Sequence, residues 1–409
     1  MVETATHDTM NRETCSTTVP VRPFHIVHVV RRGRAEGGME NGVVNVTNRL
    51  PADRYRISIC ALDSEETFSS RIQRPGTEFF LLPKTGDGID WGLVLRLAEL
   101  LRRCRADLVH SHNWGTFLYS VLAAKLAGVP IVHGEHGKNI GEIDGDGAAK
   151  RMVKRTLGRR VERIVAVCQS IADEWVEYGL PKEKVQCIPN GVDTSRFHPR
   201  EDTREFRRQF ELPESAFLVG SIGRLDELKN YDVLITALGQ LKDSFAEVHL
   251  AVLGDGPRKE RLKARAEELG IAERVHLLGY RNRPESFLAA LDIFAFPSKY
   301  EGMSNVVLEA MSSGLPIVCA DLPSHREVFS PGVEGEMVSP STAELWAEIL
   351  GELYRNTQRR RSLGLAARTK IVEKFSIEKM VSDYDRTYAV HSTARADQGD
   401  CAAGKHQAR

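Results

Sequence analysis

Short apolar runs alternate with longer amphipathic segments along most of the chain. Runs typical of strands lie at residues 24–30, 55–61, 79–82, 107–112, 130–133, 164–167 and 185–188, and again at 217–222, 248–253, 275–278, 293–296 and 316–319. Segments with helical spacing separate them, at residues 39–50, 91–104, 114–127 and 171–178, and at 230–242, 257–269, 284–291 and 305–313. Strands that alternate with helices of this length predict parallel, doubly wound sheets.

The pattern falls into two halves with the same rhythm, joined by a linker near residues 190–199. The chain has 409 residues, too many for one ordinary domain and enough for two with real cores. We therefore expect two Rossmann-like α/β domains, at residues 21–198 and 199–374, that face a cleft. Residues 1–20 are polar and rich in threonine and are expected to be disordered, and residues 392–409 are expected to form a loose tail.

Composition narrows the class of protein. Lys plus Arg and Asp plus Glu both number 56, so the chain lacks the positive excess typical of nucleic-acid-binding proteins. The seven cysteines are scattered without a CxxC pair, which is typical of a reducing cytosol. No apolar run is long enough for a membrane span. The sequence predicts a soluble, cytoplasmic protein, at most attached to a membrane surface.

A basic stretch is the exception to this balance. Residues 150–163 contain seven Lys or Arg residues and one Glu, in a segment predicted to be helical. Such a stretch is either a solvated helix or a surface for anionic lipid or for a phosphate-bearing acceptor. Because the rest of the chain is neutral, we slightly favour the second interpretation.

Residues 296–316, FPSKYEGMSNVVLEAMSSGLP, contain the most informative pattern. A strand ends there, a polar loop follows, and a helix begins near Ser304 or Asn305, both of which are good N-cap residues. Glu309 lies among apolar residues of that helix, and Glu301 precedes the helix N-terminus, which can bind an anion. Two carboxylates beside an anion site suit a nucleotide or a sugar. Alternatively, Glu301 is solvated and Glu309 pairs with a basic neighbour.

Two cations follow the strand at residues 217–222. Arg224 and Lys229 are placed to neutralise a diphosphate, although surface cations in a charged loop have the same appearance. Gly37 and Gly38 precede a helix and would let a ligand approach the backbone, but this signal is weak by itself and we favour a plain turn.

The remaining candidates for catalytic or metal-binding residues are mainly histidines. His136 follows a strand end, where it could act as an acid or a base or bind a sugar hydroxyl, whereas His133 is more typical of a structural residue. His110 and His112 share one strand face, but no carboxylate has metal-ligand spacing with them. The DGD sequence at residues 144–146 resembles a metal-binding DxD motif, yet its Gly-rich context favours a turn. We therefore expect no metal site.

Taken together, these motifs resemble family 4 of the glycosyltransferases. In chain order they are GGME, DLVHSH, HGEHG, IPNGVDTSRF, SIGRLDELKN, GDGP and EGMSNVVLE, and the resemblance covers about residues 24–390. The segment AEGGMENGVVNVTNRLP, with IVHGEHG, is similar to the subgroup associated with bacterial exopolysaccharide loci. The resemblance implies the two-domain GT-B fold. It also implies sugar transfer from a UDP- or GDP-linked donor with retention of configuration, and neither a metal nor another cofactor.

The resemblance also assigns roles to residues. Arg224 and Lys229 match the pair on the donor diphosphate, and Glu309 matches the carboxylate on the ribose. Glu301 matches the carboxylate near the reacting face of the donor sugar, and His136 matches the acceptor-side histidine. The implied catalytic group is thus His136, Glu301, Arg224 and Lys229.

Further residues are implied to bind the donor. Gly37 and Gly38 match a glycine loop near the phosphates, and the helix at residues 375–391 matches a segment that crosses back to the first domain. Backbone groups that would face the sugar and phosphate belong to Met303, Ser304, Asn305 and Val306. Many relatives have an aromatic residue at the methionine position, so the identity of the donor sugar stays open.

Two other functions remain compatible with the pattern. A sugar-nucleotide epimerase can share the two-domain fold and would convert its substrate without an acceptor. A non-enzymatic protein would bind a nucleotide sugar and release no nucleotide. The implied partners of a transferase are a nucleotide sugar, a glycan or lipid-linked acceptor, and an anionic membrane surface at the inner face of the plasma membrane, without nucleic acid.

Overall fold

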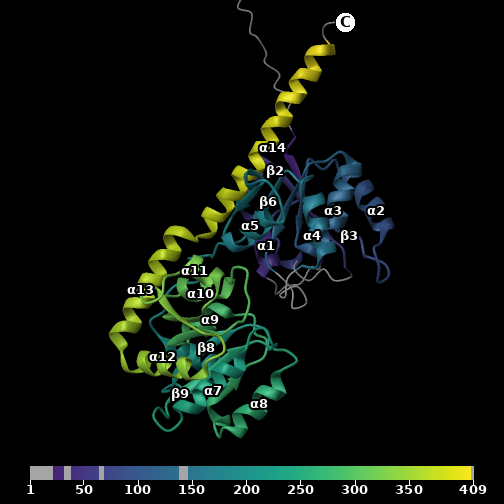
Figure 1. The fold of residues 1–409 in the computed structure, drawn as a ribbon. Coiled ribbons are helices and arrows are strands. Elements are labelled where there is room, and N and C mark those ends of the chain that lie inside the picture. The colour runs from purple at the N-terminus through teal and green to yellow at the C-terminus, as the bar shows by residue number, and fades with distance from the viewer. Residues whose placement is uncertain (1–21, 32–37, 64–68, 138–145, 407–409) are drawn as a thin grey trace, which may run out of the picture.

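The computed structural model describes residues 22–31, 38–63, 69–137 and 146–406, and it contains two parallel sheets in two lobes (Figure 1). The expected disordered segment, residues 1–20, lies outside the described residues. In the first lobe the strands are β1 (Phe24–Val30), β2 (Tyr55–Ala61), β3 (Glu78–Leu81), β4 (Leu108–His112), β5 (Ile131–Glu135), β6 (Arg163–Ala166) and β7 (Val185–Cys187). Its helices are α1 (Gly38–Arg49), α2 (Trp91–Arg103), α3 (Trp114–Ala127), α4 (Ala148–Gly158) and α5 (Gln169–Glu177).

The second lobe repeats this architecture. Its strands are β8 (Phe217–Ile222), β9 (Val248–Leu253), β10 (Val275–Leu277), β11 (Ile293–Phe296), β12 (Ile317–Ala320) and β13 (Gly335–Val338). Its helices are α6 (Thr203–Gln209), α7 (Tyr231–Leu241), α8 (Lys259–Glu268), α9 (Pro284–Ala289), α10 (Asn305–Ser312), α11 (Pro323–Val328), α12 (Ala343–Arg355) and α13 (Thr357–Lys374). A last helix, α14 (Ile377–His406), follows.

Both sheets reverse their strand order at a central strand. The first sheet has the order β3-β2-β1-β4-β5-β6-β7, and the second has the order β10-β9-β8-β11-β12-β13. Neighbouring strands pair in parallel throughout. The predicted fold class, two doubly wound parallel sheets, is confirmed. In such sheets a ligand binds beyond the carboxyl ends of the strands, next to the point where the order reverses.

Burial on both faces explains why the strands are apolar runs. All seven residues of β1 are buried, as parallel strands covered by helices require. The covering helices follow the sequence pattern: Leu93, Leu97 and Leu101 lie on one face of α2 and are inaccessible to solvent. Asp90 begins that helix by accepting a hydrogen bond from the backbone N–H of Leu93 at 2.9 Å.

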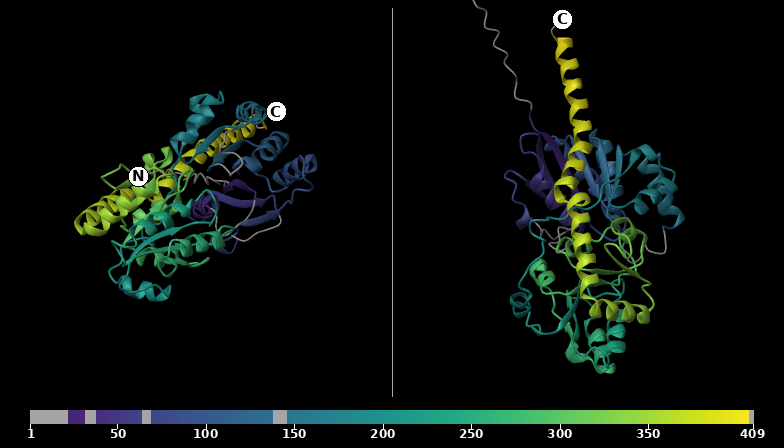
Figure 2. Two further views of the ribbon diagram at one scale, coloured as in Figure 1. Left: turned by 60° about the horizontal axis from the view of Figure 1, so that its bottom comes forward. Right: turned by 90° about the vertical axis from the view of Figure 1, so that its left-hand side faces the viewer.

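The helix α14 runs from the second lobe along the first (Figure 2). Its buried side chains Met380, Tyr384 and Tyr388 join the core formed by β1 and β2. Tyr55 of β2 donates a hydrogen bond to Asp385 at 2.8 Å.

The helix α14 continues to His406, whereas the loose tail expected at residues 392–409 stays a prediction. Residues 391–406 contain no proline, so nothing in the chain interrupts the backbone hydrogen bonds there.

A carboxylate of the second lobe caps a helix of the first. Glu327 of α11 accepts hydrogen bonds from the backbone N–H groups of Gln169 and Ser170 at 2.5 and 2.9 Å. A negative charge at a helix N-terminus is favourable, so this contact holds the two lobes together. None of the helices in the described part of the chain has both the length and the apolarity that a bilayer crossing requires.

Candidate functional site

A cavity of about 790 Å³ is lined by residues of both lobes. All the site residues predicted from the sequence that the structure describes line this one cavity, namely Gly38, His136, Arg224, Lys229, Glu301, Met303, Ser304, Asn305, Val306 and Glu309. Gly37 lies outside the described residues. The cavity lies where strands β1, β5, β8 and β11 end, as the strand order of the two sheets requires.

The N-terminal end of α10 forms part of the cavity wall. Ser304 precedes the helix in an extended conformation, and within the described structure its side chain makes no capping hydrogen bond. The first N–H groups of the helix are thus available to a ligand in the cavity. Asn305, the first helical residue, donates a hydrogen bond from its side chain to the carbonyl of Gly38 in the other lobe at 3.1 Å.

Lys229 and Glu301 form an ion pair at the cavity wall. The Nζ of Lys229 lies 2.5 Å from an oxygen of Glu301, and the side chains are only 22% and 15% exposed. Glu301 is therefore not the solvated loop residue of the simpler interpretation. Lys229 also lies over the ring of Phe296, with its Nζ 4.8 Å from the ring centre. The loops after β8 and β11 thus bring a cation and a carboxylate together.

Arg224 is the more exposed of the two predicted cations. Its side chain is 64% exposed, and its nearest carboxylate, Asp226, lies 3.9 Å away. A contact of this length on an exposed side chain contributes little to stability. The guanidinium is therefore free to form a bidentate contact with an anion that enters the cavity.

Glu309 lines the cavity from α10 and is half-buried. Burial raises the pKa of this carboxyl to about 7, while Arg196 and Arg71 act in the opposite direction and Glu285 adds to the rise. Within the described residues Glu309 forms no ion pair, so the alternative of a directly paired Glu309 is wrong. A carboxylate in this position is available to accept hydrogen bonds from a ligand.

His136 reaches the cavity from the end of β5. Its backbone N–H donates to the side chain of Asn113 at 2.9 Å, and its Nε2 lies 3.0 Å from Nδ1 of His112. Burial lowers the pKa of His136 to about 4, so its ring is neutral at pH 7. A methyl group added at Gly302 would lie 2.4 Å from the carbonyl oxygen of His136, so the two lobes meet backbone to backbone here.

Comparisons with known proteins agree with this geometry. Residues 36–196 match the family model described as Glycosyltransferase Family 4, and residues 202–370 match that of the Glycosyl transferases group 1. The D-inositol 3-phosphate glycosyltransferase of Salinispora tropica is 30% identical over 336 residues, which cover 75% of this chain and 70% of that protein. The chain belongs to the family 4 glycosyltransferases.

Other relatives place this glycosyltransferase in the same group. The putative glycosyltransferase EpsF of Bacillus subtilis is 25% identical over 338 residues, which cover 80% of this chain and 86% of that protein. The crystal structure of HepE from Anabaena in complex with UDP and glucose superimposes with a TM-score of 0.79 over 90% of this chain and all of that one, at 21% identity. This likeness confirms the GT-B fold.

Two arginines of the glycosyltransferase site were not predicted from the sequence. Arg196 and Arg71 both line the cavity, and Arg196 also binds Glu285 at 2.7 Å. Arg196 belongs to the IPNGVDTSRF motif, which could have pointed to it. Arg71 ends a short 3₁₀ helix at residues 69–71 in an irregular loop, where no periodic pattern indicates a site.

Asp146 is the only residue of the DGD segment that the structure describes, and it contacts lysines and a tyrosine. Asp146 lies 2.8 Å from the Nζ atoms of both Lys150 and Lys154, and it accepts a hydrogen bond from Tyr178 at 2.9 Å. Residues 144 and 145 lie outside the described residues. Asp146 therefore holds α4 against the lobe, as a structural residue does.

The basic stretch is shorter and less uniform than predicted. The helix α4 ends at Gly158 instead of continuing to residue 163, and Val161, between α4 and β6, is buried. Lys154 is only 3% exposed, and its Nζ lies 5.1 Å from the ring centre of Trp175. The exposed basic residues that remain include Arg151 and Arg155.

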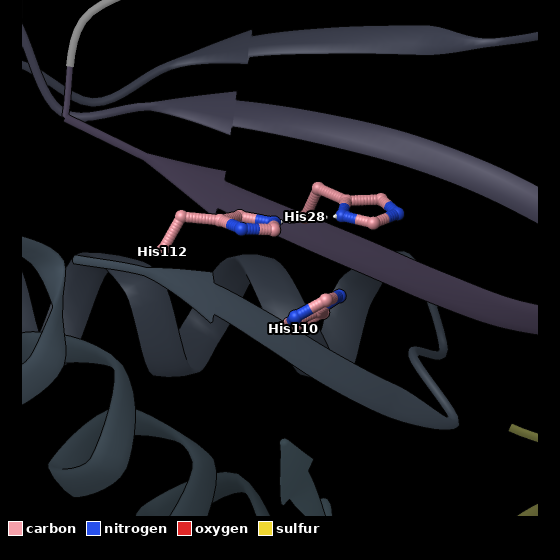
Figure 3. Close-up of side chains that lie close together, drawn as sticks. All are labelled: His28, His110 and His112. Carbon is pink, nitrogen blue, oxygen red and sulfur yellow. Dashed lines mark hydrogen bonds between the residues drawn. The ribbon is translucent and has the colours of Figure 1, made fainter. Parts of the chain in front are cut away.

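A group of buried histidines lies behind the site (Figure 3). His28 of β1 and His110 and His112 of β4 have ring nitrogens within 4.8 Å of one another. His133 also fits its predicted structural role, since it is fully buried and its Nδ1 lies 2.8 Å from the hydroxyl of Ser111.

Proposed function

We propose that this glycosyltransferase transfers a hexose from a UDP- or GDP-linked donor to an acceptor with retention of configuration, and that it needs neither a metal nor another cofactor. The observation that carries the proposal is one cavity that combines two cations, a helix N-terminus and two carboxylates. This combination suits a diphosphate with a hydroxyl-rich group on either side.

The diphosphate contacts Arg224, Lys229 and the N-terminus of α10. Lys229 is already fixed against Glu301, so its charge is in place before the leaving group develops its own. The leaving phosphate takes the proton of the acceptor hydroxyl, and no side chain has to act as a nucleophile. Electrostatic stabilisation by these fixed groups is then the main source of rate acceleration.

The carboxylates bind sugar hydroxyls on either side of the diphosphate. Glu309 accepts hydrogen bonds from the ribose, with Arg71 and Arg196 nearby to favour its charged form. Glu301 lies next to Gly302 and Met303, close to His136 on the acceptor side, and it binds the donor sugar. Closure of the lobes excludes water from the reacting atoms.

The donor is identified by the thermal stability of the protein with a panel of UDP- and GDP-linked sugars. A true donor raises the melting temperature, and the rise is larger for a ligand that binds more tightly. NMR of the product made from that donor then reports the anomeric configuration. An inverted product refutes the retaining mechanism, and a panel without any stabilising nucleotide sugar refutes the donor site.

The same assay separates the proposed reaction from the alternatives. Conversion of a nucleotide sugar without an acceptor would indicate an epimerase. Binding without release of nucleotide under any acceptor would indicate a protein that only binds the nucleotide sugar. The expected result is nucleotide release that depends on an acceptor glycan or lipid-linked sugar.

We further propose that the acceptor is a lipid-linked or polysaccharide precursor, and that the enzyme docks on an anionic membrane at the inner face of the plasma membrane. The motifs that resemble the exopolysaccharide subgroup and the similarity to EpsF support the first part. The surface of α4 supports the second, because Met152 is 70% exposed beside Arg151 and Arg155. An exposed apolar residue among cations suits an anionic bilayer.

Vesicle sedimentation tests the docking. The protein is expected to sediment with anionic vesicles at low salt, and Met152→Asp is expected to weaken this binding. Leu365→Asp is the matched control, because Leu365 is equally exposed, at 71%, on α13 of the other lobe. A wild-type protein that stays in the supernatant, or equal loss in both variants, contradicts the proposed surface.

A further inference from the structure

The two cations proposed for the diphosphate lie near opposite ends of one loop, and different parts of the second lobe hold the two ends. At the Lys229 end, the carbonyl of Leu228 accepts two hydrogen bonds. One comes from the backbone N–H of Lys299 at 2.8 Å, and the other comes from the hydroxyl of Ser298 at 3.2 Å. Lys229 is also paired with Glu301. The position of Lys229 therefore depends on the segment that follows β11.

The Arg224 end of the loop is held by the GDGP segment, residues 254–257, which follows β9. The backbone N–H of Leu225 donates a hydrogen bond to the carbonyl of Asp255 at 3.0 Å. The side chain of Leu225 is inaccessible to solvent and joins the core of the lobe. The backbone next to Arg224 is thus fixed both by a hydrogen bond and by packing.

Two glycines allow the GDGP segment to come this close. A methyl group added at Gly254 would lie 2.0 Å from the carbonyl oxygen of Gly223. A methyl group added at Gly256 would lie 2.4 Å from the carbonyl oxygen of Leu225. No side chain fits at either position, so backbone packs on backbone before and after Arg224. This contact explains why the segment needs both glycines.

Arg258, the residue after the GDGP segment, ties the same loop to α7. Its backbone N–H donates to the carbonyl of Leu225 at 3.0 Å. Its guanidinium nitrogens lie 3.6 Å from an oxygen of Glu227, in the loop, and 3.2 Å from an oxygen of Asp232, in the first turn of α7. The Arg258 side chain is only 16% exposed. A planar guanidinium that forks between two carboxylates fixes the distance between the loop and the helix.

The side chain of Arg224 contributes little to fixing its own position. It is exposed, and its guanidinium lies 3.9 Å from Asp226, which is a weak contact. The direction in which the guanidinium points is therefore set by the backbone that carries it. Arg258 itself does not line the cavity, so any effect it has on a ligand there has to pass through the loop.

We infer that Arg258 is a positioning residue, which fixes the backbone around Arg224 so that the Arg224 guanidinium meets the diphosphate of the donor. This inference rests on the proposed function, because it assumes that Arg224 binds that diphosphate. It also gives the GDGP motif a part in the site, as the segment that supports the cation loop.

The first test compares a nucleoside diphosphate with its nucleoside. Arg258→Met is expected to weaken the binding of UDP or GDP, whichever binds the wild type, by about tenfold in calorimetry, the order of one weakened charge-assisted contact. Binding of uridine or guanosine, followed by NMR titration, should be unchanged, because a nucleoside has no phosphate for Arg224 to contact. The matched control is Arg265→Met, which removes an arginine of α8 whose partner, Glu268, lies 2.7 Å away in the same helix. The control should leave both affinities at the wild-type level.

The second test asks whether Arg258 acts through Arg224. In assays of acceptor-dependent nucleotide release, Arg258→Met should lower kcat by about tenfold, and it should cause no further fall in an Arg224→Ala background. A merely structural role predicts the same fall in both backgrounds. Asp232→Asn removes one charged partner of Arg258 while it keeps the shape of the side chain. It should give the same pattern with a smaller loss, and it takes the place of Arg258→Met if that variant does not fold.

The possible outcomes separate this inference from the proposed function. Equal weakening of nucleoside and diphosphate, or a further fall in kcat in the Arg224→Ala background, would overturn the inference. If neither UDP nor GDP binds the wild type, the proposed donor site fails and the inference fails with it. If a nucleoside diphosphate binds the wild type and Arg258→Met equally well, only the inference fails.

Discussion

Replacing Gly302 with alanine tests whether the two lobes must meet backbone to backbone for the enzyme to work. The added methyl group would lie 2.4 Å from the carbonyl oxygen of His136, where real contacts stay above 3.0 Å. Both neighbours are backbone groups and cannot turn away, so the lobes must separate by more than about half an ångström. A displacement on the order of 1 Å between reacting groups costs roughly 100-fold in rate.

We therefore expect Gly302→Ala to lower kcat by about 10- to 100-fold. The melting temperature should change little, because the clash lies between the lobes and not inside either core. Steady-state assays of acceptor-dependent nucleotide release, together with thermal unfolding, measure both quantities.

A matched control keeps the result interpretable. Gly88→Ala adds the same methyl group at an exposed position with open space around it, so both activity and stability should stay at the wild-type level. If Gly302→Ala retains full activity, closure at this contact is not part of the reaction. If it unfolds at a much lower temperature than the control, the contact is a folding contact instead.

Three further predictions concern the cavity. Lys229→Ala or Glu301→Ala should lower turnover by about two orders of magnitude or more, since either change removes one member of the fixed ion pair, and near-normal transfer by a folded variant refutes the assignment. Donor affinity measured by calorimetry should rise as pH increases through about 7, where Glu309 loses its proton, and Glu309→Gln should abolish that rise. The raised pKa has the opposite effect on the unliganded protein: the stability contributed by Glu309 is present below its ordinary pKa of 4.5 and is lost as pH rises toward about 7. Finally, EDTA should leave the rate unchanged, whereas a loss restored by a divalent cation would contradict a metal-free reaction.

Periodicity was enough to predict most of the first lobe and the elements around the cavity. The strand at residues 24–30 was predicted to the residue, because every position in it is buried. The gathering of Arg224, Lys229, Glu301 and Glu309 in one cavity also followed, since the carboxyl ends of parallel strands share one edge. Their assigned roles in catalysis stay predictions.

Long-range packing determined what the pattern could not predict. The ion pair between Lys229 and Glu301 joins two residues that are 72 positions apart in the sequence. Local sequence spacing cannot predict a contact between residues so far apart. Arg71 enters the cavity from an irregular loop for the same reason. Lys154 lies in a basic stretch and would be expected at the surface. The aromatic rings and Asp146 around it nevertheless make its burial favourable.

The second half was also predicted less completely. The helices α12 and α13 and the strand β13 follow the last predicted strand and were not anticipated. The helix α13 has apolar and charged residues around its whole circumference, so it lacks the one-sided pattern by which helices are found.

The position of α14 has a consequence for synthesis on the ribosome. Domains generally fold as units, starting with the N-terminal one as the chain emerges. In this protein the folding of the first lobe cannot be completed early, because Met380, Tyr384 and Tyr388 complete its core and are synthesised near the end of the chain. Until they emerge, the apolar surface around Phe24 and Tyr55 stays uncovered. A nascent chain stalled before residue 377 is therefore expected to bind chaperones through its first lobe, although all the strands of that lobe have already been made.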